Sequence, residues 1–444
     1  MPDRLLSFYG DDFTGSSDVM EAMAGQGVPT VLFTRLPTEA EFHPFADYPA
    51  VGLAGSSRSQ APDWMDVHLT PALAWLKDLG ARHCHYKICS TFDSSPTIGS
   101  IGKAIDIGRA VFDQQTVPLI VGVPELKRYT VFGHLFAAYQ GTVYRIDRHP
   151  VMRRHPVTPM DEADLRRHLG RQTATPIGLV GLDMLAGPSR DTDTDRLITD
   201  KLGIILFDVA DAASQLEVGR QLVRQAARLG PFVAGSSGVE YALLRAMAAA
   251  GATSGAARFA PLPPADRIIV VSGSVSPTSE RQIRYALANG FDGIAADAIA
   301  LATDRAAECA RVEVAALAVL RAGRSPLIHP ALGPATDHGR ALDAIPGARQ
   351  ATGEALGWIA RRLIEHSGIR RIIFAGGDTS SHALGQLNVH ALTTRFPLSA
   401  TPGSPLCTAH SATPGLDAIE LAMKGGQVGH DDYFVSLRDG LEVA

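Results

Sequence analysis

The sequence has little cysteine, few aromatic residues and no long apolar run. Its four cysteines, Cys84, Cys89, Cys309 and Cys407, are scattered over 444 residues, which argues against a disulfide framework. No apolar stretch approaches the length of a membrane-spanning helix, and the first residues lack the charged-then-apolar pattern of a signal peptide. We therefore expect a cytoplasmic protein that has no membrane partner.

A strong net charge is absent as well. Forty-one Lys and Arg residues against 46 Asp and Glu residues give a net charge of −5, which provides no general field for nucleic acid. An anionic small molecule would need a local basic cluster. The group His83-Cys84-His85 with Cys89 suggests a metal site, but no second pair follows at zinc-finger spacing, so alternation along a strand explains it better.

Length and composition indicate an α/β enzyme of two domains. A chain of 444 residues exceeds the usual size of a single core, and 43 glycines with 28 prolines suggest many tight loops. The segment 251–265 is rich in small residues and proline and has no periodicity, so we place a linker there. Residues 1–250 and 266–444 each alternate strand and helix patterns, which predicts two domains, each an α/β sheet with flanking helices.

The most informative stretch is an apolar run that ends in a glycine-bounded acidic loop. Leu5–Tyr9 predicts a buried strand, Gly10 and Gly15 supply turn freedom, and Ser16 or Ser17 is the predicted N-cap of the next helix.

Asp11 and Asp12 therefore follow the carboxyl end of the first strand, where ligands bind in open α/β sheets. A lone aspartate at this position often only stabilises the turn or the helix N-terminus. Two in succession favour a chemical role.

Polar clusters follow two other predicted strands of the first domain. Ser57 and Arg58 come after the strand 50–54, and the planar fork of an arginine suits a carboxylate. Lys87 lies in the strand 83–88, ahead of Ser90 and Thr91. A proline-bounded loop at 153–160 adds a third cluster, which contains His155. Together these clusters predict a polar pocket.

The second domain contains two strand–glycine–helix units. The predicted strand 268–271 runs into Ser272-Gly273-Ser274, and the strand 371–375 runs into Gly376-Gly377. Backbone N–H groups at such turns bind anions, which suggests a phosphate cradle. The sequence has no P-loop and no dinucleotide fingerprint, so we expect a nucleotide site of another type. The alanine-rich stretches 298–321 and 351–366 predict packed helices without a chemical role, the second ending at Gly368.

Taken in order, these stretches resemble the four-carbon acid sugar kinase family, bacterial enzymes that phosphorylate threonate, erythronate, 3-oxo-tetronate and related acids with ATP. The resemblance spans nearly the whole chain. The residues that carry it are Gly10-Asp-Asp-Phe-Thr-Gly15, Ser57-Arg58, Lys87 with Ser90-Thr91, His155-Pro-Val-Thr-Pro-Met160, Ser272-Gly-Ser274, Gly376-Gly-Asp-Thr379 and Pro402-Gly403.

The resemblance implies an N-terminal acid-sugar-binding domain, a C-terminal nucleotide-binding domain and an active site in the cleft between them. It further implies ATP and Mg²⁺ as cofactors and a homodimer. Carried over residue by residue, it assigns catalysis to Asp12 and Asp11, the acid sugar to Ser57, Arg58, Lys87, Ser90, Thr91 and His155, and ATP to Ser272, Ser274, Gly376, Gly377, Asp378, Thr379 and Gly403. Asp12 is the expected proton acceptor, whereas Asp11 has an open role: it orients Asp12, holds magnesium or fixes the loop.

One segment departs from the family pattern. Relatives typically have an aspartate before the Ser-Thr pair and an Arg-Gly soon after, whereas this chain has Cys89 at the first place and Asp93-Ser94 at the second. The variant resembles the branch associated with apiose degradation. A 3-oxo-isoapionate-type substrate is therefore a candidate beside the linear four-carbon acids.

Two other functions fit the paired aspartates. A metal-dependent aldolase or hydrolase would turn over a sugar acid with a metal ion and without ATP. A non-catalytic two-domain protein would bind a sugar acid, and a nucleotide, and leave both unchanged.

Overall fold

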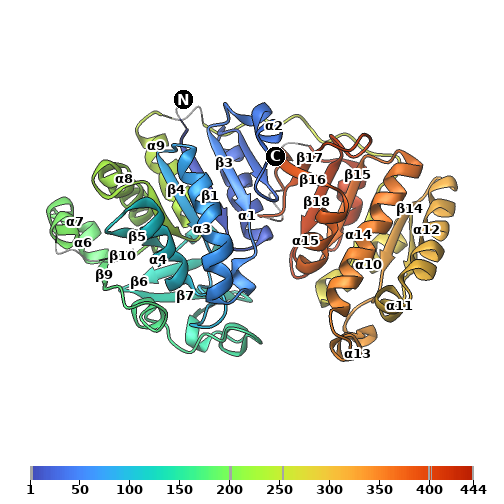
Figure 1. Cartoon of the computed structure of the whole chain (residues 1–444), viewed down its shortest axis with the longest axis horizontal. Helices are drawn as coiled ribbons and strands as arrows, with labels where there is room; N and C mark the ends of the chain where they lie inside the picture. Colours follow the sequence, from blue (N-terminus) through green and yellow to red (C-terminus); the bar gives the residue numbers. More distant parts are fainter. Residues whose placement is uncertain (1–3, 200–202, 253–254, 399–400, 402, 443–444) are drawn as a thin grey trace. The chain divides into compact units, whose positions relative to one another are not determined.

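The computed structural model describes residues 4–199, 203–252, 255–398, 401 and 403–442 of the chain. The chain divides into two compact units, Met1–Ala257 and Arg258–Ala444, which are coloured blue to green and yellow to red in Figure 1. Both units are α/β, which confirms the predicted fold class. The domain bounds 1–250 and 266–444 with a linker at 251–265 remain a prediction.

The N-terminal unit is built on a parallel sheet with the strand order β2-β3-β1-β4-β11-β5-β10-β9. Every residue of β1, β4 and β11 is buried, as expected for a parallel sheet covered on both faces. The bounds of its strands are β1 (Leu6–Gly10), β2 (Thr30–Phe33), β3 (Ala50–Ala54), β4 (His83–Lys87), β5 (Val117–Ile120), β9 (Ile177–Val180), β10 (Ile204–Phe207) and β11 (Phe232–Gly235).

Helices cover both faces of this sheet (Figure 1). Helices α3 and α4 pack against each other, and α9 packs against α1 and α8. A separate antiparallel sheet, β6-β7-β8, joins this unit. The bounds are α1 (Phe13–Gly25), α2 (Glu39–Phe42), α3 (Pro62–Asp78), α4 (Ile101–Phe112), α5 (Leu165–Leu169), α6 (Leu182–Ala186), α7 (Arg190–Thr199), α8 (Ala212–Leu229), α9 (Gly238–Ala249), β6 (Arg128–Val131), β7 (His134–Tyr139) and β8 (Thr142–Arg145).

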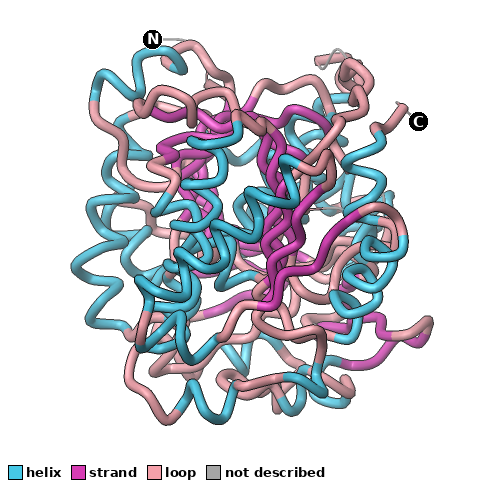
Figure 2. The backbone as a smooth tube through the Cα atoms, turned by 90° about the vertical axis from the view of Figure 1, so that its right-hand side faces the viewer, coloured by secondary structure: helices cyan, strands magenta, loops and turns pink. Residues whose placement is uncertain are grey.

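The C-terminal unit has a mixed sheet with the strand order β13-β14-β12-β15-β18-β17-β16, whose first five strands are parallel and whose last two pairings are antiparallel. Figure 2 faces this unit and shows strands running between helices. The bounds of the strands are β12 (Ile269–Ser272), β13 (Phe291–Ala295), β14 (Ser325–His329), β15 (Arg371–Ala375), β16 (Val389–Phe396), β17 (Leu406–Ser411) and β18 (Glu420–Lys424).

Two groups of helices accompany this sheet. Helix α14 packs with α11, α12 and α15, and α10 packs with α16. The bounds are α10 (Pro277–Ala288), α11 (Ala298–Thr303), α12 (Arg305–Arg321), α13 (Gly339–Asp343), α14 (Ala348–Ser367), α15 (Gly377–Gln386) and α16 (Tyr433–Asp439). The end of α14 follows the prediction, because Gly368 takes the left-handed conformation with φ 69°.

Two local predictions were wrong. The N-cap of α1 is Asp12 rather than Ser16 or Ser17, because the Asp12 backbone is extended and its carboxylate accepts the Gly15 N–H. The stretch 298–321 forms two helices rather than one, because Asp304 leaves the helical conformation with φ −132° and ψ 53°.

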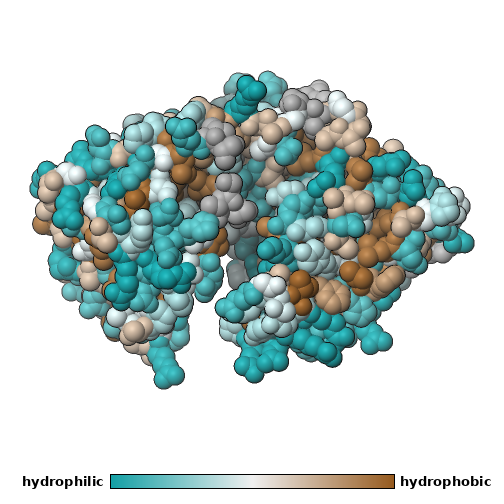
Figure 3. Space-filling model, turned by 180° about the vertical axis from the view of Figure 1, so that it is seen from behind, coloured by the Kyte–Doolittle hydropathy of each residue, from teal (hydrophilic) through white to brown (hydrophobic). Residues whose placement is uncertain are grey.

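One face of the molecule is shown by residue hydropathy in Figure 3. In the view of Figure 3 hydrophilic residues predominate and apolar side chains form scattered patches. Among the described residues, no helix is both long enough and apolar enough to pass through a membrane.

Candidate active site

The predicted acid-sugar residues gather at the carboxyl ends of three neighbouring strands of the N-terminal unit. Strand β1 lies between β3 and β4, and Gly10 is in register with Ala54 on one side and with Lys87 on the other. Asp11 and Asp12 follow β1, and Arg58 lies in the short 3₁₀ helix η2 (Ser57–Ser59) after β3. Parallel strands bring these loops to one edge of the sheet, where such folds bind ligands.

Arg58 holds two carboxylates with the fork of its guanidinium. Its Nη1 donates to Asp12 Oδ2 at 2.9 Å, and its Nη2 donates to Asp93 at 2.9 Å from Oδ1 and 2.8 Å from Oδ2. The Asp93 side chain is only 1% exposed. Since a buried carboxylate needs a partner, Arg58 also fixes the loop that follows β4.

The Asp12 carboxylate accepts two hydrogen bonds from the protein and remains accessible to solvent. Its Oδ1 accepts the Gly15 N–H at 2.6 Å and its Oδ2 accepts from Arg58, while 34% of the side chain is exposed. A Cβ atom on Gly15 would lie 2.6 Å from Asp12 Oδ1 and 3.0 Å from Lys87 Nζ, so a larger residue there would collide with the site. The carboxylate is therefore oriented and still open to a ligand.

Asp11 differs from its neighbour because it is buried. Its Oδ1 has no hydrogen-bond partner among the described residues. Burial, followed by the negative charge of Asp12, raises the pKa of Asp11 to about 7, against the pull of Arg58 and Lys87. Two adjacent aspartates thus differ in environment, which is typical of functional carboxylates.

The raised pKa of Asp11 predicts a stability that depends on pH. The folded pKa lies above the ordinary value of 3.8, so the native state keeps a proton that the unfolded state has lost. Stability therefore falls as the pH rises from about 4 to about 7, and the full cost is present above pH 7. Replacing Asp11 with Asn should raise stability by about 2–4 kcal/mol at pH 8 and leave it nearly unchanged at pH 4.

Thermal unfolding at the two pH values measures this effect. Asp66→Asn is the matched control, because Asp66 forms an exposed ion pair with Lys103 and should change stability by less than about 1 kcal/mol at either pH. Equal effects of Asp11→Asn at pH 4 and pH 8 would show that the Asp11 carboxyl does not titrate in this range.

Lys87 is buried among acids rather than open to solvent. Its Nζ lies 3.9 Å from Asp18 Oδ2 in helix α1. Burial lowers the pKa of Lys87, but the charges of Asp18, Asp11 and Asp12 outweigh it and raise the pKa above its ordinary value. Lys87 therefore stays charged and offsets part of the negative charge in the site.

The remaining predicted acid-sugar residues differ in burial and in the hydrogen bonds that their side chains already make. Ser57 is buried and its hydroxyl bonds Tyr86 Oη at 2.9 Å. Thr91 is buried and its hydroxyl donates to Asp93, whereas Ser90 is partly exposed. His155 Nδ1 lies 3.1 Å from the Thr158 hydroxyl.

Thr158 joins the loop of His155 to the site. Its hydroxyl donates to Asp93 Oδ2 at 3.4 Å. Asp93 therefore links loops that are far apart in the sequence, and the structure brings His155 toward Arg58 through two side chains.

Sequence reasoning missed Arg128, which begins β6. Its Nη1 donates to the carbonyl oxygens of Leu126 and Lys127 at 2.8 and 3.3 Å, and no carboxylate of the described chain pairs with it. Its Nε is buried without a partner in the same described residues. Burial lowers the pKa of Arg128, and the neighbouring Cys89 opposes this shift. Cys89 also raises the pKa of Arg58, so the three side chains lie in one environment. No sequence motif marked this position.

The predicted nucleotide residues of the C-terminal unit form a second cluster. Strands β12 and β15 are neighbours, and Ser272 is in register with Ala375 just before Gly376. Gly376 has φ 118°, a conformation that favours glycine. A Cβ atom on Gly273 would lie 1.8 Å from Thr379 Oγ1, so the two loops touch.

The hydroxyls of this cluster are differently engaged. Ser272 Oγ is buried and has no hydrogen-bond partner in the described part of the chain. Ser274 Oγ accepts the Ser276 N–H at 3.3 Å, and Ser276 caps α10 as the sequence predicts.

The other predicted nucleotide residues flank these loops. Gly377 begins α15, and Gly403 has φ 85°. The side chain of Asp378 and all of Pro402 lie outside the described residues.

A cavity of about 90 Å³ lies beside this cluster within the C-terminal unit. Gly273 and Thr379 line one side of it. Its other lining residues include both apolar and polar side chains: Val275, Ala298, Pro330, Ala331, Asp337, His338, Leu342, Arg349, Thr352, Gly353 and Leu356.

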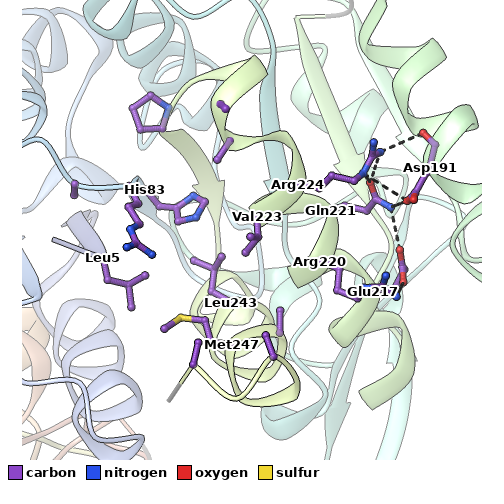
Figure 4. A pocket seen from close by; sticks show the side chains of 18 residues that line it. Leu5, His83, Asp191, Glu217, Arg220, Gln221, Val223, Arg224, Leu243 and Met247 are labelled. Carbon is purple, nitrogen blue, oxygen red and sulfur yellow. Dashed lines mark hydrogen bonds and ion pairs between the residues drawn. The ribbon is translucent and has the colours of Figure 1, made fainter. Parts of the chain in front are cut away.

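A larger cavity, about 760 Å³, lies elsewhere in the N-terminal unit (Figure 4). Leu5 and His83 line it at the amino ends of β1 and β4, opposite the ends that carry Asp11 and Lys87. Arg224 forms an ion pair with Asp191, and Gln221 donates a hydrogen bond to the same carboxylate.

Among the described residues, no group of three or more His, Cys, Asp or Glu side chains is arranged to hold a metal ion by itself.

Comparison with known proteins gives two family matches. Residues 6–243 match a family described as a sugar-binding N-terminal domain, and residues 269–434 match a nucleotide-binding C-terminal domain. A crystal structure of a Haemophilus influenzae protein has a TM-score of 0.74 at 23% identity, over 97% of this chain and 99% of that one, which shows a shared fold.

Several characterised relatives are similar over nearly their full length. A 3-oxo-isoapionate kinase of Paraburkholderia graminis is 43% identical over 98% of this chain and 94% of its own. A 3-oxo-tetronate kinase of Methylobacterium radiotolerans is 32% identical over 97% of both chains, and one of Cupriavidus necator is 30% identical over 97% of this chain and 95% of its own.

Proposed function

The chain belongs to the four-carbon acid sugar kinase family, and we propose that it transfers the γ-phosphoryl group of ATP to the primary hydroxyl of a branched 3-oxo acid of the 3-oxo-isoapionate type. The observation that carries the substrate is the identity of 43% to a 3-oxo-isoapionate kinase, against 30–32% to two 3-oxo-tetronate kinases. The departure from the family pattern at Cys89 and Asp93-Ser94 supports the same substrate. The enzyme is thus a kinase rather than an aldolase, a hydrolase or a non-catalytic binding protein.

Asp12 is the proposed proton acceptor for the attacking hydroxyl. A primary alcohol is a poor nucleophile at neutral pH and needs a positioned base. Asp12 is oriented by Gly15 and Arg58 and remains partly exposed, so its free lone pairs are available to the substrate. Asp11 is buried behind the same loop and is the proposed magnesium donor of the site.

The acid sugar carries a carboxylate, yet the site holds more acids than bases. Among the described residues, the cations that neutralise Asp11, Asp12, Asp18 and Asp93 are Arg58 and Lys87. Arg128 brings a cation that no carboxylate of the described residues neutralises. We therefore assign the substrate carboxylate to Arg128 together with the remaining N–H groups of Arg58.

Ser57, Ser90, Thr91, His155 and Lys87 are the remaining proposed contacts of the acid sugar. Ser57 and Thr91 are already engaged, so they would support the shape of the pocket, while the partly exposed Ser90 and His155 would reach hydroxyl groups.

The nucleotide is assigned to the C-terminal unit. We assign the phosphates to the backbone N–H groups at the start of α15, directly after Gly376. The hydroxyl of Ser272, which has no hydrogen-bond partner among the described residues, lies at the same strand ends. We assign the adenine base to the side of the adjoining cavity of about 90 Å³, which Gly273 and Thr379 help to line. Ser274, Gly377, Asp378, Thr379 and Gly403 complete the proposed ATP contacts.

Magnesium fits the carboxylates of the N-terminal unit. Mg²⁺ binds through one or two carboxylates plus substrate phosphates, and the unpartnered Asp11 Oδ1 beside Asp12 is a donor of the right kind. When bound, the ion would neutralise charge on the phosphates.

Resemblance to the family also predicts a homodimer. Light scattering measures the molar mass of the protein in solution and therefore tests this prediction directly.

Kinetics with paired substrates test the proposed specificity. With ATP and Mg²⁺, kcat/KM for 3-oxo-isoapionate should exceed that for 3-oxo-tetronate by at least about tenfold. The reverse order would contradict the branched substrate and leave the kinase activity intact. Absence of ADP formation with every acid sugar would contradict the activity itself.

A further inference from the structure

Lys424 is a buried lysine without an acidic partner in the part of the chain that the structure describes. It ends strand β18, is 1% exposed and is the sole lysine in residues 258–444. No carboxylate of the described residues pairs with its ammonium, and burial alone lowers its pKa to about 8. A buried charge without a counter-charge is costly, and proteins rarely keep one that has no use.

The contacts of Lys424 offset only part of that cost. Its Nζ donates to the carbonyl oxygen of Gly425 at 3.0 Å and to Ser279 Oγ at 3.4 Å, and it lies 5.9 Å from the centre of the Tyr433 ring. These partners are neutral. The ammonium has three N–H groups, and the described residues provide acceptors for two of them.

Lys424 lies at the same edge of the sheet as the proposed phosphate cradle. Strand β18 pairs with β15, with Lys424 in register with Ala375, and the Gly376 N–H donates to the Lys424 carbonyl oxygen at 2.9 Å. The positive side chain therefore belongs to the strand next to the Gly376 turn.

The glycines that follow Lys424 contact the other loop of the cradle. A Cβ atom on Gly426 would lie 2.4 Å from Ser274 Oγ, and the Gly426 carbonyl oxygen accepts the hydroxyls of Ser276 and Ser279. The loops after β12, β15 and β18 thus form one connected cluster.

We propose that Lys424 is the cation of the nucleotide site, and that its Nζ binds a phosphate oxygen of the bound nucleoside triphosphate. This inference rests on the proposed kinase function. The phosphate would supply the negative charge that none of the described side chains brings to this amine. A charge-assisted bond to phosphate then adds to the neutral N–H donors at the start of α15.

Calorimetric titration with ATP and with adenosine separates this role from a structural one. Lys424→Met keeps the length of the side chain and removes the charge, a change that buried sites usually tolerate. ATP should bind about 10- to 100-fold more weakly to this variant, whereas adenosine should bind within about twofold of the wild type. Lys103→Met, which removes a surface ammonium paired with Asp66 in the N-terminal unit, should alter neither affinity.

The outcomes are distinct. A wild-type protein that does not bind ATP would contradict the nucleotide site and with it the role of Lys424. Unchanged ATP affinity in Lys424→Met, with ATP bound by the wild type, would contradict the role of Lys424 alone. An equal loss of adenosine and ATP affinity would show that Lys424 supports the fold and does not bind phosphate.

A second measurement uses the wild-type protein alone and so does not depend on the folding of a variant. Because the pKa of Lys424 is about 8, part of this amine is neutral at pH 8.5, and a bound phosphate should draw a proton onto it. ATP titrations of the wild type in buffers of different ionisation enthalpy should show uptake of a fraction of a proton. Zero uptake at every pH between about 7 and 9, one unit on either side of this pKa, would contradict the proposal.

Discussion

Replacing Asp12 with Asn should lower kcat by about 10²–10⁴-fold, as expected when a general base is lost. The change should leave the affinity for ATP nearly unaltered, because the nucleotide is assigned to the C-terminal unit. Asn is as good an N-cap as Asp, so helix α1 should keep its start and its capping bond to Gly15. Steady-state kinetics together with calorimetric binding of ATP measure the effect.

Asp211 provides the matched control. It caps helix α8 of the same unit through a bond to the Ser214 N–H at 2.8 Å, and it lies outside the proposed site. Asp211→Asn should retain kcat within about twofold. If Asp12→Asn also retained near-normal kcat, Asp12 would not be the proton acceptor, and the raised pKa of Asp11 would make that residue the next candidate.

Removing Arg58 should have the largest effect on stability. Arg58→Met would leave the Asp93 carboxylate, 1% exposed, without its cation, which typically costs about 3–5 kcal/mol. Activity should be lost as well, because Asp12 would no longer be oriented. Chemical unfolding of the full chain measures the loss of stability, and the rate of ADP formation measures the loss of activity.

Two further variants identify the cause. Asp93→Asn added to Arg58→Met removes the stranded charge and should recover much of the stability but none of the activity. Arg166→Met breaks a more exposed pair with Asp164 and should cost about 1 kcal/mol or less. A loss below about 1 kcal/mol in Arg58→Met would mean that Arg58 does not neutralise Asp93.

Strand ends and glycine turns could be predicted from the sequence because they depend on local patterns. Apolar runs that end in Gly10 and Ala375 mark buried strands, and the loops that follow them contain Asp12 and Gly376. Ser276 followed by Pro277 marks the start of α10 for the same reason.

Pairings between distant segments could not be predicted in this way. Asp12 caps α1 because its backbone is extended. The sequence does not show this conformation, and the nearby serines are N-cap residues of similar preference. The bond of Arg58 to Asp93 and the burial of Lys424 depend on which strands are neighbours. The same holds for Arg128, which has no carboxylate partner among the described residues. A single sequence does not specify that order.

Phosphorus NMR of the reaction mixture tests the central claim most directly. With purified protein, ATP, Mg²⁺ and 3-oxo-isoapionate, we expect ADP and, in equal amount, a new phosphomonoester signal coupled to the protons of a CH₂ group. ADP accompanied by inorganic phosphate alone, or ATP left intact beside an altered acid sugar, would contradict phosphoryl transfer to a primary hydroxyl.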